Sequence, residues 1–251
     1  MRAFGIGLGQ VVTLVRETRV IESAPEYVAV AGPGARELAL ALAEGGDASA
    51  VAVDGDPGAA AVAIWIVSGP VAPEERALLR RAVRAGKPIL VVRHGEDTVP
   101  YALPHNVLDG VGLSIEALGE AVARVAPDAA PVLAARLPLL RPAAERRLIG
   151  VTAWGNALLA ASSRGGGPQL PLLSIAQSRM LLLLATGRGH RLPSDPKAIA
   201  KVAGIPIAAS VVVGLGAREL VRRLPVDGPA VRAAVAYAGT RALGAARLRL
   251  P

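Results

Sequence analysis

Short apolar runs and longer segments of helical periodicity alternate over about the first half of the chain. The apolar runs predict four strands, and a turn that contains Gly follows each of them. Because two prolines interrupt residues 99–107, a fifth strand there is expected at an edge of the sheet, with a loop as the alternative. The four strands cover residues 27–31, 50–53, 62–67 and 89–92.

Helices are predicted between these strands, at residues 35–43 and 72–85, and a further helix follows Ser114, which can cap it. Strands that alternate with helices favour a mostly parallel sheet covered on both faces. About eight residues separate the second and third strands, which is too few for a helical crossover. This region is therefore expected to be trimmed or partly antiparallel.

The rest of the sequence contains helical patterns separated by Gly- and Pro-rich breaks. The predicted fold class is an α/β domain with a trimmed, mostly parallel sheet of the GTPase or Rossmann type, followed by an all-α domain. Three parts are expected: a docking helix at residues 1–25 without the features of a signal peptide, the α/β domain at 26–130, and a helical domain at 131–251. A Pro- and Ala-rich segment, residues 126–131, is predicted to be a linker or a break between helices. The last part has helical patterns at residues 143–161, 171–186, 196–224 and 229–248.

Composition and charge restrict the classes of protein. The chain is 52% hydrophobic, 2% aromatic and free of Cys, which excludes disorder, disulfides and thiolate metal sites. The formal net charge of +8 is unevenly distributed: residues 1–130 contain 11 Lys and Arg against 16 Asp and Glu, whereas residues 131–251 contain 17 against 4. An anionic membrane surface or an acidic protein partner would therefore bind the second half. The alternative is that its arginines only take the place of lysines on helical faces exposed to water.

The turn after the first strand has some features of a dinucleotide-binding loop. Gly32 and Gly34 fit the first two glycines, and Asp54 ends the next strand 20 residues after Gly34, where a ribose-binding carboxylate is expected. Glu37 stands in place of the third glycine, and its charge would occupy the positive helix end that receives phosphates. A phosphate loop would need Gly, Lys and Ser or Thr at positions 37–39, which hold Glu, Leu and Ala. A tight turn that binds no cofactor is expected, with GTP/GDP or NAD as alternatives.

The loop after the fourth strand lies where a guanine-binding loop would hold Asn-Lys-x-Asp, and it keeps only Asp97 of that motif. Three stretches nearby resemble the middle of bacterial GTPases, between their Asp-x-x-Gly and Asn-Lys-x-Asp elements: residues 63–67, 73–81 and 86–92. The resemblance covers roughly residues 26–126 and implies a degenerate GTPase-like domain. Because the active residues of that family are absent here, it implies no hydrolysis.

Three runs in the second half carry a further resemblance: residues 178–184, 214–220 and 234–244. They resemble the C-terminal helical domain of the YcjF-type family (domain of unknown function 697). That domain often follows a GTPase domain and is considered membrane-associated. The resemblance therefore implies a GTPase-associated helical domain at a membrane.

The longest uncharged stretches of this half, residues 148–163 and 202–217, have 16 residues each. A helix of this length reaches about 24 Å, which is short of the roughly 30 Å hydrocarbon core. We expect a soluble bundle, or peripheral association with anionic lipid at the inner face of the cytoplasmic membrane. Scarce aromatic residues argue against nucleic acid. The residues predicted to bind an anionic surface are Arg218, Arg222, Arg223 and Arg241.

No arrangement of residues for catalysis is recognised, because the three histidines are scattered and neither a metal-ligand spacing nor a nucleophile elbow occurs. The sequence predicts a non-catalytic pseudo-GTPase, a scaffold or regulatory adaptor in the bacterial cytoplasm that is peripheral to the membrane. The first alternative is a soluble dinucleotide- or small-molecule-binding protein that uses Gly32, Gly34 and Asp54. The second is a GTPase with unusual motifs, and assembly into a homo-oligomer is left open.

Overall fold

The computed structural model divides the chain into two compact units. The α/β unit comprises Ser23–Arg147 and Gly187–Gly189, and the helical unit comprises Met1–Glu22, Leu148–Thr186 and His190–Pro251. The structure describes residues 13, 16–18, 21, 27–95, 99–162, 169–190, 208, 212, 215, 216, 219 and 228–249. Each unit is described below by itself.

The α/β unit contains a five-stranded sheet in which all neighbouring strands are parallel. The strand order is β2-β1-β3-β4-β5, which is one of the common orders of doubly wound sheets. The predicted fold class, an α/β domain followed by helices, is confirmed, whereas the partly antiparallel alternative is wrong. The strands are β1 (Val28–Ala31), β2 (Val51–Val53), β3 (Val62–Val67), β4 (Ile89–Arg93) and β5 (Val107–Asp109).

Between β2 and β3, a loop takes the place of the helix that usually connects two strands of a parallel sheet. The Tyr27 hydroxyl donates to the carbonyl oxygen of Asp56 over 3.0 Å, and the N–H of Ala61 donates to the carbonyl of Tyr27 over 2.9 Å. The carboxylate of Asp56 in turn accepts a hydrogen bond from the N–H of Gly58. The connection is therefore fixed to the start of β1, and the sheet is trimmed rather than antiparallel.

The edge strand β5 is shorter and later than the sequence predicts. Pro104 opens a 3-10 turn, η3 (Pro104–Asn106), and β5 begins only after it. This is consistent with the missing N–H of Pro, which cannot donate to a strand ladder.

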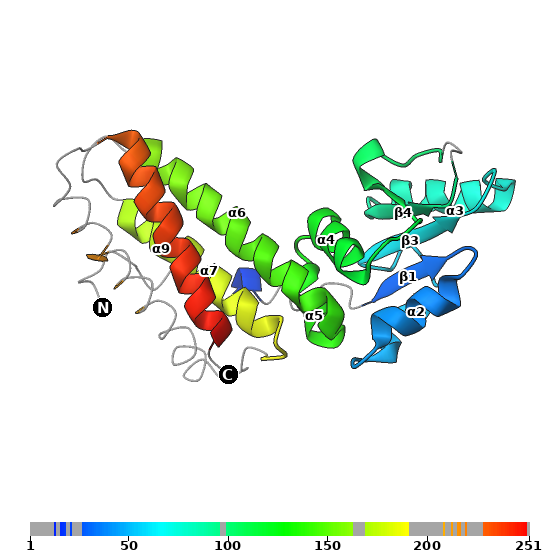
Figure 1. Ribbon diagram of the computed structural model, residues 1–251, viewed down its shortest axis with the longest axis horizontal. Coiled ribbons are helices and arrows are strands. Elements are labelled where there is room, and N and C mark those ends of the chain that lie inside the picture. Colours follow the sequence, from blue (N-terminus) through cyan, green and yellow to red (C-terminus); the bar gives the residue numbers. More distant parts are fainter. Residues whose placement is uncertain are drawn as a thin grey trace. The chain divides into compact units, whose positions relative to one another are not determined.

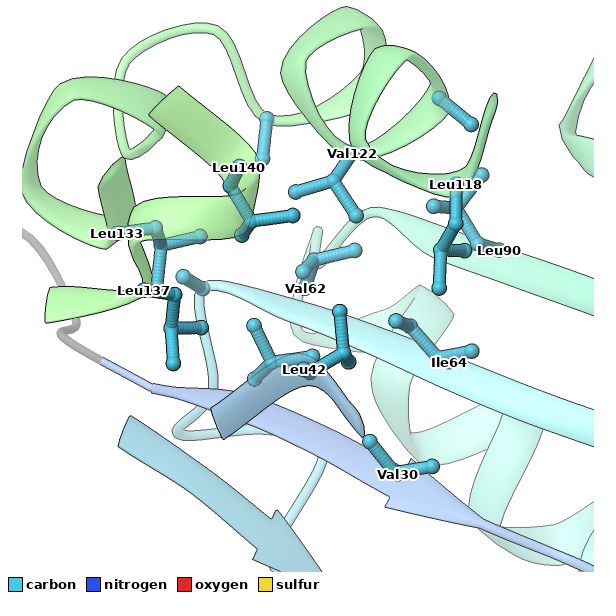
Figure 2. Packing of buried hydrophobic residues seen from close by; sticks show 14 of the residues in the cluster. Val30, Leu42, Val62, Ile64, Leu90, Leu118, Val122, Leu133, Leu137 and Leu140 are labelled. Carbon is cyan, nitrogen blue, oxygen red and sulfur yellow. The ribbon is translucent and has the colours of Figure 1, made fainter. Parts of the chain in front are cut away.

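Alternation along the central strands separates two cores. Even-numbered side chains of β1, β3 and β4 pack under α2 (Ala35–Ala43), α4 (Ile115–Val125) and α5 (Ala130–Arg136), as Figure 2 shows. Odd-numbered side chains face α3 (Pro73–Arg84), which covers the other face of the sheet (Figure 1). Both faces are covered, which explains why the strands read as apolar runs. The labelled core residues in Figure 2 are Val30, Leu42, Val62, Ile64, Leu90, Leu118, Val122, Leu133, Leu137 and Leu140.

The helix ends follow local chemistry. The Ser114 hydroxyl accepts a hydrogen bond from the N–H of Ala117 over 3.1 Å, so the predicted cap of α4 is confirmed. The Pro- and Ala-rich segment after α4 is the break between α4 and α5, and its residues Ala126 and Ala129 are buried in the core under these helices.

An ion pair ties α5 to the segment before β2. Arg136 Nη2 lies 2.7 Å from Asp47 Oδ2, and the Ser49 hydroxyl donates to Asp47 Oδ1 over 2.7 Å. The hydrogen bonds from Ser49, followed by those from Arg136, lower the pKa of Asp47 to about 2. The carboxylate is stabilised in its charged form because every one of these partners is a donor.

The helical unit contains α7 (Gln169–Thr186), α9 (Pro229–Arg249) and most of α6 (Arg141–Ser162), which begins in the α/β unit. These helices lie within two residues of three predicted ones. Most of the predicted helix at 196–224 and most of the predicted docking helix at 1–25 lie outside the described residues. Among the helices that the structure describes, none combines the length and the hydropathy that a membrane span requires.

Helices α6, α7 and α9 lie side by side (Figure 1), and both polar and apolar side-chain contacts hold them together. The Thr240 hydroxyl oxygen of α9 accepts hydrogen bonds from Asn156 of α6 over 2.9 Å and from Gln177 of α7 over 3.0 Å. One turn further along α9, a Cβ added to Gly244 would lie 2.7 Å from Ile149 of α6. Small residues on α9 therefore allow the helices to approach closely.

Candidate functional site

The first candidate site is the sheet edge where β1 and β3 end. After β1 the chain enters α2 on one face, and after β3 it enters α3 on the other. In open parallel sheets, ligands bind at this topological switch point, outside the carboxyl ends of the strands. The turn of residues 32–34 and the end of β2 both reach this edge.

Gly32 is fixed by its contact with β3. Its φ is +100°, and a Cβ at this position would lie 2.0 Å from the carbonyl oxygen of Ile66. The carbonyl of Gly32 accepts a hydrogen bond from the N–H of Ala35 over 3.1 Å, which begins the turn into α2. The glycine is therefore required by the close approach of two backbone segments.

Gly34 caps α2 in the left-handed conformation, with φ of +78°. A Cβ on Gly34 would lie 3.8 Å from Glu37 Oε2, so the Glu37 carboxylate folds back along the first turn of the helix. The positive end of the helix dipole favours an anion at this place. Glu37 supplies that anion from the protein itself, at the end that would receive a ligand phosphate.

Asp54 lies beside the end of β1. Its N–H donates to the carbonyl of Val30 over 2.9 Å, its φ is +54°, and its side chain is exposed. The structure thus brings Gly32, Gly34 and Asp54 to one edge of the sheet, as the dinucleotide hypothesis requires. Asp97, the fourth predicted nucleotide-binding residue, lies outside the described residues.

The end of β4 is closed by a contact that the sequence did not reveal. The His94 ring lies over Gly110, where an added Cβ would meet its atoms at 2.4 to 2.7 Å. The N–H of Gly110 donates to the carbonyl of Arg93 over 2.8 Å. The histidine therefore packs against the backbone after β5. The sequence signal for this contact is Gly110 directly after the edge strand β5. It could not be interpreted without knowing that β4, which His94 follows, is the neighbour of β5.

Among the residues that the structure describes, no group of three or more His, Cys, Asp or Glu side chains could hold a metal ion.

The second candidate site is the exposed surface of α6 and α9. Of the four arginines predicted to bind an anionic surface, Arg218, Arg222 and Arg223 lie outside the described residues, and Arg241 is exposed on α9. Arg241 Cζ lies 6.0 Å from the centroid of the Tyr237 ring. The Tyr237 ring lies 5.1 Å from that of Trp154 on α6, at an interplanar angle of 57°. Sequence reasoning did not place these two aromatic residues together, although they are the aromatic residues of the second half of the chain.

The run at residues 234–244 has a structural role in α9. Thr240 and Gly244 from this run lie one turn apart and are the buried residues of α9. They make the close contacts of α9 with α6 and α7 described above. These contacts explain a Thr and a Gly at this spacing by helix packing alone.

No family model, curated protein or solved structure matches the chain.

Proposed function

We propose that the protein is a non-catalytic, GTPase-like scaffold or regulatory adaptor. In this proposal the α/β unit turns over no nucleotide, and the helical unit associates peripherally with the anionic inner face of the cytoplasmic membrane. The protein would act through what it binds, not through a reaction.

The observation that carries the proposal is the position of Glu37 at the switch point. Its carboxylate folds along the helix end that a phosphate would occupy. An incoming phosphate would meet this negative charge. The loop lysine that neutralises phosphate charge in nucleotide hydrolases is absent, since position 38 is Leu. Gly32, which fits the first glycine of such a loop, is accounted for by its contact with Ile66.

The charge of the helical unit supports the membrane part of the proposal. This unit contains 15 Lys and Arg against 5 Asp and Glu, a formal net charge of +10. Anionic lipids attract such a unit by about 1 kcal/mol for each basic residue near the surface. The α/β unit contains 13 against 15 and supplies no comparable attraction.

One observation favours a second candidate, a dinucleotide-binding protein. Asp54 is exposed and lies beside the end of β1, where a ribose hydroxyl would need an acceptor. This candidate requires the phosphates to bind next to Glu37.

Calorimetric titration of the full chain with GTP, GDP, NAD and NADP, with Mg²⁺ present, tests both candidates. The proposal predicts no affinity tighter than about 1 mM and no phosphate release. Micromolar binding of GTP with turnover would show a GTPase and refute the proposal. Micromolar binding of NAD that is lost in Asp54→Asn and kept in Asp56→Asn would establish the dinucleotide-binding protein instead.

A further inference from the structure

An exposed apolar stripe follows one face of α6. Val151, Trp154 and Leu158 are spaced by three and four residues, and they are 59%, 62% and 67% exposed. Residues 148–162 of this helix contain no charged side chain. We call these three residues the α6 stripe. A helical face of this kind is expected to be covered by an apolar medium or by a partner.

Two side chains of α9 extend this surface. Tyr237 contacts Trp154 through its ring, and Arg241 Cζ lies over the Tyr237 ring, 6.0 Å from its centroid. Trp and Tyr each combine an apolar ring with a polar group, which suits the boundary between water and lipid tails. The guanidinium beside them suits a lipid phosphate.

The charge of the helical unit selects the kind of partner. At a formal net charge of +10, two copies of this unit repel each other, whereas an anionic surface attracts it. A ridge of one apolar helix with aromatic rings at its side also fits a planar layer of headgroups better than it fits a protein groove, because it needs no complementary shape.

We propose that the α6 stripe, together with Tyr237 and Arg241, inserts into the headgroup layer of an anionic bilayer. The inference rests on the peripheral membrane association in the proposed function, and it names the residues in contact with lipid. Trp154 and Leu158 enter the boundary of the acyl chains, and Arg241 pairs with lipid phosphates.

Vesicle flotation of the full chain tests this placement. Vesicles of phosphatidylcholine with phosphatidylglycerol are compared with phosphatidylcholine alone, at low and high salt. We expect the wild type to float with the anionic vesicles only, and less at high salt because the charges are screened. Leu158→Glu is expected to weaken partitioning at least tenfold, since it removes the burial of one leucine. Arg241→Gln is expected to weaken it about fivefold.

Leu172→Glu is the matched control, because Leu172 is 52% exposed in the same unit but belongs to α7. It should weaken partitioning by less than about fivefold, the effect of one charge, since it leaves the α6 stripe intact. Vesicles with brominated acyl chains supply an independent measurement. They should quench the fluorescence of Trp154, whereas Trp65, which is 4% exposed in the sheet, gives a constant background. Circular dichroism of each variant verifies that it is folded.

Each other outcome overturns the inference in a different way. If the wild type does not float at low salt, or binds polyglutamate in place of vesicles, the membrane part of the proposed function fails as well. If Leu158→Glu floats like the wild type and brominated lipid does not quench, the protein binds membranes through another surface and only this inference fails. If the wild type is a dimer that Leu158→Glu dissociates, and vesicles do not quench Trp154, the stripe is an interface between two copies.

Discussion

Replacing Gly32 by Ala measures how tightly the β1–α2 turn is held against β3. A φ of +100° costs an alanine about 1–3 kcal/mol. Its Cβ would also lie 2.0 Å from the carbonyl oxygen of Ile66, so the turn must move by about 1 Å, at an overpacking cost of about 1–3 kcal/mol. Gly69→Ala is the matched variant, because Gly69 has a φ of +119° and no atom within 4 Å of an added Cβ. It incurs only the first cost. The gain from a less flexible unfolded chain is the same in both variants and cancels.

Urea unfolding, followed by circular dichroism and by the fluorescence of the buried Trp65, gives the free energy of unfolding of each variant. We expect Gly32→Ala to lose about 2 kcal/mol more than Gly69→Ala. Equal losses, within about 0.5 kcal/mol, would show that the turn has room for a side chain. In that case the glycine would need a ligand to explain it, and the nucleotide interpretation of this turn would gain support.

Three further predictions concern charge and buried hydrogen bonds. Because the pKa of Asp47 is about 2 in the folded protein and about 4 when unfolded, its contribution to stability is complete above pH 4 and is lost as the pH falls towards 2; NMR titration should show the pKa of Asp47 rising in Arg136→Met. Glu37→Gln should destabilise the protein by about 0.5 kcal/mol in urea unfolding, whereas Glu44→Gln at the other end of α2 should stabilise it slightly, because the helix dipole reverses sign between them; effects of the same sign would contradict the placement of Glu37. Thr240→Val should lower the free energy of unfolding by about 2–4 kcal/mol, since the buried amides of Asn156 and Gln177 lose their acceptor. Thr240→Ser keeps the hydroxyl and should lower it by less than half as much in the same urea unfolding experiment. Equal losses in the two variants would assign the effect to packing.

The elements of the fold were readable wherever local chemistry sets them. The helix at residues 35–43 matches α2, because Gly34 and Glu44 bound an apolar periodic segment. The run at 62–67 matches β3, which is buried along its whole length. The direction of strand β2 relative to β1 was not predictable from the sequence. It depends on the path of a loop that Tyr27 fixes from 29 residues away.

The candidate sites divide in the same manner. The sequence assigned Gly32 and Asp54 to the ends of two strands, and in the structure both lie at one edge of the sheet, because the ends of parallel strands meet there. The contact between Trp154 and Tyr237 was not predictable, since it depends on how α6 and α9 align across the 82 residues of intervening chain. Periodicity alone states which face of a helix is apolar, and not which residue of another helix lies beside it.

The thinness of the loop between β2 and β3 is matched by small side chains in the strands beneath it. Ala29 and Ala52 are register partners on the sheet face that this loop crosses, and a Cβ on Gly55 of the loop would lie 2.7 Å from that of Ala52. The opposite face of the same strands, under α2, presents Val28 and Val30. The alternation of Val and Ala in these strands therefore follows the thickness of the layer that covers each face. Larger side chains lie beneath a helix, and methyl groups lie beneath the loop. A helix inserted at this crossover would need larger residues at positions 29 and 52 to fill the added depth.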